Sequence, residues 1–480
     1  MDINAIMKNL RTKGLRETLR IRADRSADPR QKRLRRKLRA TRILQPVMAE
    51  AGSSPEDLAA METILQEMER ADVNTLNDDR FSEWDQRMRA LEKPPVRRAL
   101  RTKFIKEVLP NAYDEAAAAP VTNDIVFLQP RKGLNQSFQY IYHRIERDYP
   151  YTPRLFELQR GIVSATEHYL NAERFIRAAA TAKAIMVHES SEFLGYVNIR
   201  PETRVIQLWH GCGIIKSIGL DNANKPGFKS QADYEEFPEY NKYDLVTIAS
   251  EELRWVFERF MGLPAGSPVI QPIGVSRTDE FFDPEYIDRC YQKLYERIPA
   301  AREKKVILYA PTYRGVDPNR VAPDRVDIPL FARELSDEYI LIIKHHQTAK
   351  DLPPIPEEYD GVFAWDMTRG QGMNINELMT VSDVCISDYS SLVFEFSLFQ
   401  RPILLYLFDV EDYRDSRGMY YSCEELSACG PVFKTSEDMV EYLRHLDERF
   451  DKSQVTAFRD KYMSACDGHA TERIMEFIEG

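Results

Sequence analysis

The chain has 480 residues, more than one compact hydrophobic core usually holds, so we expect two domains and an appendage. Its 43% hydrophobic and 30% charged residues are typical of a folded protein and argue against a wholly disordered chain. The net charge of −10 argues against a general nucleic-acid binder, so we expect no nucleic-acid partner.

Positive charge gathers at the N-terminus. Residues 1–47 hold fifteen Lys or Arg against four Asp or Glu, a net charge of +11, which leaves −21 for the rest of the chain. Residues 1–118 read as helical throughout, so we expect a basic helical N-terminal extension. Four apolar residues of this segment fall near one helix face: Leu34, Leu38, Ile43 and Leu44. The basic residues around them are Arg33, Arg36, Lys37 and Arg39. Such a helix suits an anionic membrane surface, at about 1 kcal/mol for each basic residue near the headgroups. A solvated arm or an oligomerisation helix explains the pattern equally well.

The six cysteines include no CxxC pair, so the sequence predicts neither a disulfide framework nor a cysteine metal site. The N-terminus lacks the continuous apolar segment of a signal peptide. No stretch approaches the apolar length of a membrane span. We therefore expect the protein in the reducing cytoplasm.

From residue 119 onward, apolar runs predict short buried strands. The first series is NDIVFLQP (123–130), KAIMVHES (183–190), TRVIQLWHGCG (203–213), YDLVTIAS (243–250) and SPVIQPIG (267–274). A helical pattern is expected over 156–180, another over 251–262, and a helical link over 284–302.

The alternation then restarts. The second series is KKVILYAPTYRG (304–315), EYILIIKHHQ (338–347), GVFAWD (361–366), DVCISDYSS (383–391) and RPILLYLFD (401–409). Runs that do not alternate with polar residues indicate strands covered on both faces, hence parallel sheets. Two β/α series predict an α/β fold with two Rossmann-like, doubly wound domains facing a cleft. We place these domains at 119–295 and 296–436, and expect helices of 437–480 to cross back over both.

Ligands of open α/β sheets bind beyond the carboxyl ends of the strands, so the polar residues there are the informative ones. They are His210, Thr312, Arg314, His345, His346, Asp388, Ser390 and Ser391. The two serines begin a helix, where unpaired N–H groups favour an anion, although serine also caps helices without any ligand. Arg314 offers a planar fork suited to phosphate. A neutral His210 suits a general base near pH 7, and the alternative is a structural core histidine.

Several ordered segments resemble the CDP-glycerol glycerophosphotransferases, the family of teichoic-acid primases and polymerases. The segments are QLWHG (207–211), PIGVSRTDEFF (272–282), LYAPTYR (308–314), LIIKHHQ (341–347), ISDYSS (386–391), RPILLYLFDVEDYRDSRGMYY (401–421) and DGHATERI (467–474). The sequence departs from the family pattern at Ser276 and Gln347, where the family has proline. The resemblance covers residues 120–480 and implies a GT-B fold.

The resemblance implies transfer of glycerol phosphate from CDP-glycerol to a hydroxyl of a lipid-linked or polymeric acceptor, with release of CMP, in teichoic-acid-like or capsule polymer synthesis. It assigns His210 as base and His346 as the second catalytic histidine. The expected donor-binding residues are Thr312, Arg314, Asp388, Ser390, Ser391 and Arg417. The expected supporting residues are Gly211, Arg277, Asp279 and Glu395. We expect no cofactor and no metal, because no Asp-x-Asp pair follows a strand. A lipid acceptor places the protein on the inner face of the cell membrane.

Two alternatives stay open. One is another GT-B transferase that uses CDP-ribitol, CMP-sialic acid or a nucleotide sugar. The other is a nucleotide-binding GT-B module without transfer activity. Neither the acceptor, the choice between primase and polymerase, nor the oligomeric state follows from these residues.

Overall fold

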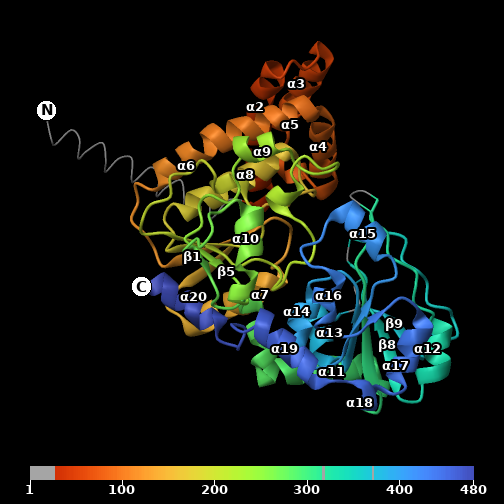
Figure 1. The fold of residues 1–480 in the computed structure, drawn as a ribbon. Helices are drawn as coiled ribbons and strands as arrows, with labels where there is room; N and C mark the ends of the chain where they lie inside the picture. Colours follow the sequence, from red (N-terminus) through yellow and green to blue (C-terminus); the bar gives the residue numbers. More distant parts are fainter. Residues whose placement is uncertain (1–27, 316–318, 347, 370–371) are drawn as a thin grey trace, which may run out of the picture.

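The computed structural model describes residues 28–480 apart from 316–318, 347 and 370–371, and the side chains of 415–417 also lie outside the described part. The N-terminal extension is a set of packed helices above the first domain (Figure 1). Its elements are α2 (Pro29–Glu50), α3 (Pro55–Arg70), η1 (Val73–Thr75), α4 (Asp78–Leu91), α5 (Pro94–Lys103), η2 (Phe104–Val108) and α6 (Leu109–Ala116).

The first domain is a six-stranded parallel sheet in the order β2-β1-β3-β4-β5-β6. Its strands are β1 (Asp124–Gln129), β2 (Thr152–Glu157), β3 (Ala184–Val187), β4 (Arg204–Gln207), β5 (Leu245–Thr247) and β6 (Ile270–Gln271). Its helices are α7 (Gln136–Asp148), α8 (Ala165–Ala179), α9 (Gln231–Glu236) and α10 (Arg254–Met261), with short turns η3 (Glu192–Leu194), η4 (Gly219–Asn222), η5 (Glu251–Leu253) and η6 (Ser276–Phe282).

The second domain repeats this architecture in the order β12-β11-β10-β7-β8-β9, again all parallel. Its strands are β7 (Lys305–Ala310), β8 (Tyr339–Ile343), β9 (Ala364–Asp366), β10 (Val384–Ser387), β11 (Ile403–Tyr406) and β12 (Val432–Phe433). Its helices are α11 (Pro284–Arg297), η7 (Pro299–Arg302), α12 (Ile328–Leu335), α13 (Ile375–Val381), α14 (Leu392–Ser397), α15 (Val410–Arg417), α16 (Cys423–Ser427), α17 (Ser436–Leu443) and α18 (Leu446–Arg449).

The last two helices return to the first domain. α19 (Lys452–Tyr462) lies against α14 and η5, and α20 (Ala470–Glu479) packs on η6. Ile474 and Ile478 of α20 share a hydrophobic cluster with Phe127 of β1. The C-terminus therefore ends beside the first sheet, as Figure 1 shows.

The two parallel sheets confirm the predicted α/β class with two Rossmann-like domains. Two strands differ from the sequence-based expectation. β2 occupies residues 152–157 and was not expected. It overlaps the start of the helical pattern expected over 156–180, and α8 begins only at Ala165. β2 is an edge strand whose side chains are only partly buried, so its sequence TPRLFE lacks the apolar run that marks a buried strand. β12 is a two-residue edge strand, too short to leave a pattern.

The N-terminal extension shares its hydrophobic core with the first domain. Trp84, Phe104 and Leu109 belong to the same buried cluster as Phe175 of α8. Phe104 also stacks on Tyr169 of α8, with ring centroids 5.2 Å apart. A helix bundle that buries its apolar face against a neighbouring domain gains its stability from that domain.

Six basic residues of α2 pair with acidic residues of the fold. Lys37 is buried at 1% exposure and bonds to Glu167 of α8 at 2.7 Å and to Asp85 of α4. Further pairs are Arg30–Asp28, Arg33–Asp78, Arg36–Glu167, Arg39–Glu173 and Arg42–Glu69. Leu34 and Leu44 are buried in the core. Several of these side chains still reach solvent, with Arg39 at 54% and Arg42 at 62% exposure. The membrane contact of the basic extension stays a prediction, and residues 1–27 lie outside the described residues.

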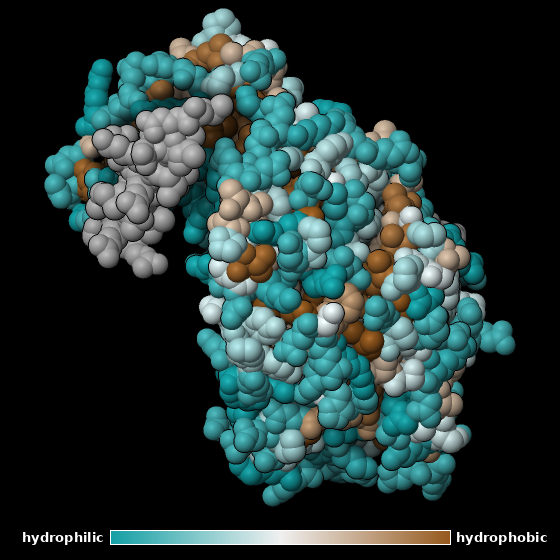
Figure 2. Space-filling view, turned by 90° about the vertical axis from the view of Figure 1, so that its left-hand side faces the viewer, coloured by the Kyte–Doolittle hydropathy of each residue, from teal (hydrophilic) through white to brown (hydrophobic). Residues whose placement is uncertain are grey.

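Within the described part, none of the helices has the length and apolarity needed to cross a bilayer. The face seen in Figure 2 is largely hydrophilic, with apolar residues in small groups. All six cysteines are unpaired, which agrees with the absence of a disulfide framework in the sequence.

Candidate active site

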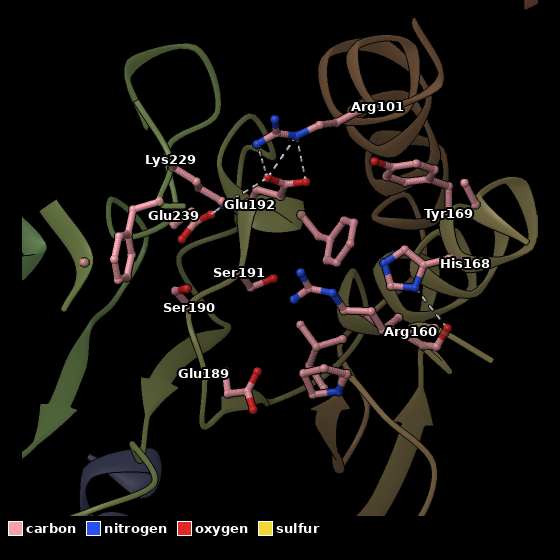
Figure 3. A pocket seen from close by; sticks show the side chains of 18 of the residues that line it. Arg101, Arg160, His168, Tyr169, Glu189, Ser190, Ser191, Glu192, Lys229 and Glu239 are labelled. Carbon is pink, nitrogen blue, oxygen red and sulfur yellow. Dashed lines mark hydrogen bonds and ion pairs between the residues drawn. The ribbon is translucent and has the colours of Figure 1, made fainter. Parts of the chain in front are cut away.

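A cavity of about 1080 Å³ lies where the extension and both domains meet. His210 of the first domain lines it together with His346 of the second. Loops that follow β1, β2, β3 and β4 form much of its wall, as expected for ligands at the carboxyl ends of parallel strands. Helices α4 and α5 of the extension contribute further residues. Figure 3 shows the first-domain side, with Arg101 and Tyr169 at one end and Glu189 at the other.

His210 sits in a tight turn after β4. Trp209 adopts a left-handed backbone with φ of 57°, and its N–H donates to the side-chain oxygen of Gln207 at 2.9 Å. The His210 ring packs against Trp209 with centroids 4.5 Å apart. Its Nδ1 donates to the carbonyl of His188 at 3.1 Å. In the neutral ring this leaves Nε2 unprotonated, the state that a general base requires.

The cavity walls remove water from around the His210 ring while solvent still reaches it. This desolvation lowers the pKa of His210. The His188 carbonyl and the nearby Glu189 carboxylate oppose the shift, whereas the charge of Arg277 adds to it. His210 is therefore neutral near pH 7 and able to accept a proton.

His346 follows β8 and also faces the cavity, while its neighbour His345 is buried. Its Nδ1 accepts the backbone N–H of Thr348 at 3.2 Å, so a neutral ring carries its proton on Nε2. Desolvation, followed by the charges of Lys216, Arg320 and Arg131, lowers the pKa of His346 to about 4. His346 is thus a neutral hydrogen-bond donor surrounded by cations.

The cations around His346 were missed by sequence reasoning. Arg320 lies with its guanidinium carbon 4.8 Å from the centre of the Tyr313 ring, and Lys216 lies 5.6 Å from the same ring. Tyr313 also packs edge-on against His346 at 5.0 Å. Lys216 and Arg320 stand in long loops well beyond a strand end, where the strand-end rule gives no signal. Together with His346 they form a positively charged wall suited to phosphate.

Asp388 organises the loop after β10. Its carboxylate accepts the N–H of Thr312 at 2.8 Å and of Tyr389 at 2.7 Å. It also receives Arg314 Nη1 at 2.9 Å, while Asp409 binds the other side of this guanidinium at 2.6 and 3.0 Å. Arg314 therefore already has two carboxylate partners, and Asp409 is a member of this group that the sequence did not single out. The donor-binding roles of Thr312, Arg314 and Asp388 stay predictions.

Ser390 and Ser391 begin α14, as expected. Ser391 occupies the N-cap position, but its side chain makes no capping hydrogen bond. Ser390 Oγ accepts the N–H of Leu392 at 3.4 Å. A Cβ added to Gly211 would lie 3.2 Å from Ser391 Oγ, so the His210 turn and the start of α14 meet across the domain boundary.

The expected supporting residues join the domains. Arg277 donates to the His210 carbonyl and to Asn376 of α13, both at 2.6 Å. Glu395 is buried, and its carboxylate accepts the N–H of Cys212 at 3.1 Å. Burial raises the pKa of Glu395, and Arg277, 4.0 Å away, opposes the shift.

Asp279 has a different position. It accepts the N–H groups of Ala470 at 3.1 Å and Thr471 at 2.7 Å, and so fixes the start of α20. Burial raises the pKa of Asp279 to about 6. The side chain of Arg417 lies outside the described residues. In the part that the structure describes, no group of three or more His, Cys, Asp or Glu is arranged to hold a metal ion.

Comparison with known proteins matches residues 113–480 to the family described as CDP-Glycerol:Poly(glycerophosphate) glycerophosphotransferase. A teichoic acid poly(ribitol-phosphate) polymerase from Bacillus spizizenii is 31% identical over 76% of this chain, which spans 58% of that polymerase. A teichoic acid ribitol-phosphate primase from the same species is 28% identical over 78% of this chain and 96% of its own length. A teichoic acid glycerol-phosphate primase from Bacillus subtilis is 28% identical over 62% of this chain and 74% of its own length. The solved structure of the wall teichoic acid polymerase TagF has a similar fold, with a TM-score of 0.62 and 22% identity over 80% of this chain and 97% of that one.

Proposed function

The chain belongs to the CDP-glycerol:poly(glycerophosphate) glycerophosphotransferase family and is an enzyme of that class, and on this basis we propose its reaction. The enzyme moves glycerol phosphate from CDP-glycerol to a hydroxyl of a lipid-linked or polymeric acceptor and releases CMP. The observation that carries the proposal is that His210 and His346, from different domains, line one cavity. An unprotonated Nε2 on one side and a cationic wall on the other are what a phosphate transfer needs.

The proposed step is a displacement at phosphorus. His210 Nε2 takes the proton of the acceptor hydroxyl as its oxygen attacks the phosphorus that carries glycerol. The bond from this phosphorus to the oxygen of CMP breaks, and CMP leaves with the bonding electrons. His346 donates a hydrogen bond to the departing phosphate, and Lys216 and Arg320 offset its growing negative charge. Positioning and charge stabilisation supply most of the rate in such reactions.

We place the diphosphate of the donor against the second domain, near Ser390 and Ser391. The Ser391 hydroxyl makes no capping bond, which supports this placement because the hydroxyl is available to a ligand. Asp388 holds the loop in shape and does not react. If Arg314 binds phosphate, it exchanges its contact with Asp409 for the ligand.

The deciding experiment incubates the purified protein with CDP-glycerol and a synthetic lipid-linked disaccharide, and weighs the products by mass spectrometry. CDP-ribitol is the second donor to test, because two of the relatives above carry ribitol in their names. CMP-sialic acid and UDP-sugars complete the set. Growth of the acceptor by one glycerol phosphate or more supports the proposal. If the acceptor grows only by ribitol phosphate, the enzyme is a ribitol phosphate transferase. If a nucleotide binds but no product forms, the protein is a nucleotide-binding module without transfer activity.

The role of His210 is tested by His210→Ala. Turnover should fall by a factor of about a hundred or more, while CDP binding measured by calorimetry persists. A variant with near-normal turnover removes His210 as the base. Loss of CDP binding as well would instead assign His210 to the donor site.

We further propose that no divalent metal takes part, because His346, Lys216 and Arg320 are placed to offset the charge of the leaving group. Treatment with EDTA should leave the initial rate unchanged. A rate that falls with EDTA and returns with Mg²⁺ contradicts this proposal.

The protein is proposed to work in the cytoplasm, at the inner face of the cell membrane, where a lipid acceptor would be reached. Residues 1–27 carry seven of the fifteen basic residues of the N-terminal segment and are the proposed contact with anionic lipid. Deleting them should abolish salt-sensitive binding to vesicles that contain anionic lipid. Unchanged binding, or binding that salt does not weaken, discards this segment as the tether.

A further inference from the structure

The side of the cavity formed by the N-terminal extension carries three arginines that the proposed reaction does not use. Arg89 of α4, Arg97 of α5 and Arg160 after β2 all line the cavity. No residue in the described part of the chain hydrogen-bonds or ion-pairs with any of their guanidinium groups. Arginines that face a cavity without a counter-charge are suited to an anionic ligand, above all to phosphate.

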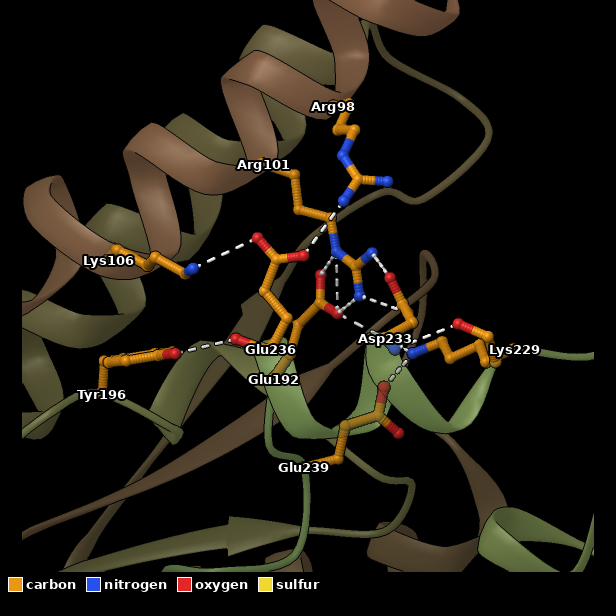
Figure 4. A network of polar contacts seen from close by, with 10 residues as sticks. Arg98, Arg101, Lys106, Glu192, Tyr196, Lys229, Asp233, Glu236 and Glu239 are labelled. Carbon is orange, nitrogen blue, oxygen red and sulfur yellow. Dashed lines mark hydrogen bonds and ion pairs between the residues drawn. The ribbon is translucent and has the colours of Figure 1, made fainter. Parts of the chain in front are cut away.

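The other cations on this side already have partners. Arg101 binds Glu192 at 2.6 Å and Asp233 at 2.6 Å, and Lys229 pairs with Glu239 and Glu192 (Figure 4). Glu192 and Glu239 of this wall are therefore paired with Arg101 and Lys229. Of the other carboxylates that line the cavity, Glu92 is bonded to the first turn of α8, and Glu189 lies at the opposite end. Within the described part of the chain, Arg89, Arg97 and Arg160 are the arginines of this wall that form no ion pair with any of these carboxylates.

The turn between α4 and α5 is fixed to the first domain. Glu92, 2% exposed, accepts the N–H of Ala165 at 2.6 Å and both the N–H and the hydroxyl of Thr166, at 2.9 and 2.7 Å. It thereby satisfies the first turn of α8. Arg89 and Arg97 flank Glu92 in the sequence, so this buried bond fixes the backbone from which both arginine side chains extend.

Arg160 approaches from the first domain. Its N–H donates to the Pro130 carbonyl at 2.8 Å, and Gln159 before it has a left-handed φ of 54°. Figure 3 shows its side chain pointing into the cavity, toward the side of Ser190 and Ser191. A left-handed backbone at a residue other than glycine is favoured only where the surroundings fix it, so the backbone that carries Arg160 is fixed.

Two buried polar atoms beside these arginines lack a partner. The hydroxyl of Ser191, a residue 7% exposed that lines the cavity, makes no hydrogen bond within the described structure. Arg89 Nε is likewise buried and unsatisfied. Unsatisfied buried donors are uncommon in folded proteins and indicate a missing ligand or water. His168 adds a polar group, because its Nδ1 contacts the Leu158 carbonyl at 3.0 Å and its ring lines the cavity.

We propose that Arg89, Arg97 and Arg160, with Ser191, form a subsite that binds a phosphate group of the acceptor. The inference rests on the proposed function, since it concerns the second substrate of the same cavity. The ligand is a phosphate ester or a diphosphate, either in the growing chain or in the link between the acceptor and its lipid. Arg89 and Arg97 precede the residues that match the family, so this chain's own extension completes its acceptor site.

The test measures binding without any donor. Two fluorescent probes are titrated by anisotropy: a glycerol phosphate trimer, and a short-chain prenyl diphosphate that carries a disaccharide. Arg160→Gln and Arg97→Gln should each lower the affinity for at least one probe by about tenfold. This factor corresponds to the loss of one hydrogen bond from a charged group. The matched control is Arg98→Gln on the same helix, because Arg98 pairs with Glu236 and does not line the cavity. Thermal melting checks that every variant is folded.

The two probes identify the source of the phosphate. Weakening for the trimer alone assigns the subsite to the polymer chain, and weakening for the diphosphate alone assigns it to the lipid link. The subsite proposal is contradicted if the wild-type protein and both variants bind the probes with equal affinity. It is also contradicted if Arg98→Gln loses as much affinity as the other variants, or if the wild-type protein binds neither probe. Because no donor is present, absence of transfer activity does not affect this result. In the transfer assay, the KM for the acceptor should rise while the affinity for CDP stays unchanged.

Discussion

At the scale of single residues, the two cavity histidines are kept neutral by their surroundings. Desolvation lowers the pKa of both His210 and His346. His210 acts as a base in its neutral form, which persists as the pH falls until the lowered pKa is reached. The acid limb of the kcat/KM profile should therefore have its midpoint below 6.5, the ordinary value for histidine. Initial rates between pH 4.5 and 8 measure it, and a midpoint above 7 contradicts the assignment.

Gly213 permits a close approach between the domains. A Cβ at this position would lie 2.2 Å from an atom of the Phe394 ring, whereas one at Gly211 would lie 3.2 Å from the tip of Ser391. Gly213→Ala should lower the free energy of unfolding by about 1–3 kcal/mol, because the ring must move in a packed interior. Gly211→Ala, measured beside it by urea unfolding, should cost less. Equal stability of Gly213→Ala and the wild-type protein would contradict this packing.

Sequence reasoning reached residues at strand ends and missed those in long loops. His210 and His346 follow apolar strands, so their arrival in one cavity could be predicted. Arg320, Arg97 and Arg160 reach the same cavity from a long loop, an appended helix and an edge strand. Their position depends on how distant segments pack, which no local pattern records.

At the scale of elements, α2 is bound to α8 and α4 by a buried cation. Lys37→Ala leaves Glu167 buried with only Arg36 nearby, at 3.6 Å. The free energy of unfolding should fall by about 3 kcal/mol, the lower end for breaking a buried ion pair, since that second arginine remains. Arg42→Gln breaks an exposed pair on the same helix and should cost less than about 1 kcal/mol. Similar unfolding midpoints for the two variants would contradict the buried role of Lys37.

Some strands could be predicted from the sequence more readily than others. Central strands such as β7 and β10 are buried along nearly their whole length, so their continuous apolar runs predicted them. β2 carries Thr152, Pro153 and Arg154 at an exposed sheet edge, so neither its alternation nor its hydrophobicity marks a strand. The basic stripe of α2 resembled a lipid-binding face because most acids that pair with it lie on other helices, in α3, α4 and α8.

At the scale of the whole molecule, the extension and the first domain form one folding unit. Deleting residues 1–118 would expose the apolar surface around Phe175 and Tyr169 that α5 and α6 cover. This truncated protein should aggregate or bind a hydrophobic dye, although the family match covers 113–480. A soluble, cooperatively melting 119–480 fragment would contradict the shared core.

The contact between Gly213 and Phe394 also limits how the lobes can move. Beside it, Ser217 donates to the Gly418 carbonyl at 3.1 Å and Tyr420 donates to the Ile215 carbonyl at 2.8 Å. Because Gly213 lies only three positions from His210, we expect any movement of the two domains about this contact to displace His210 least.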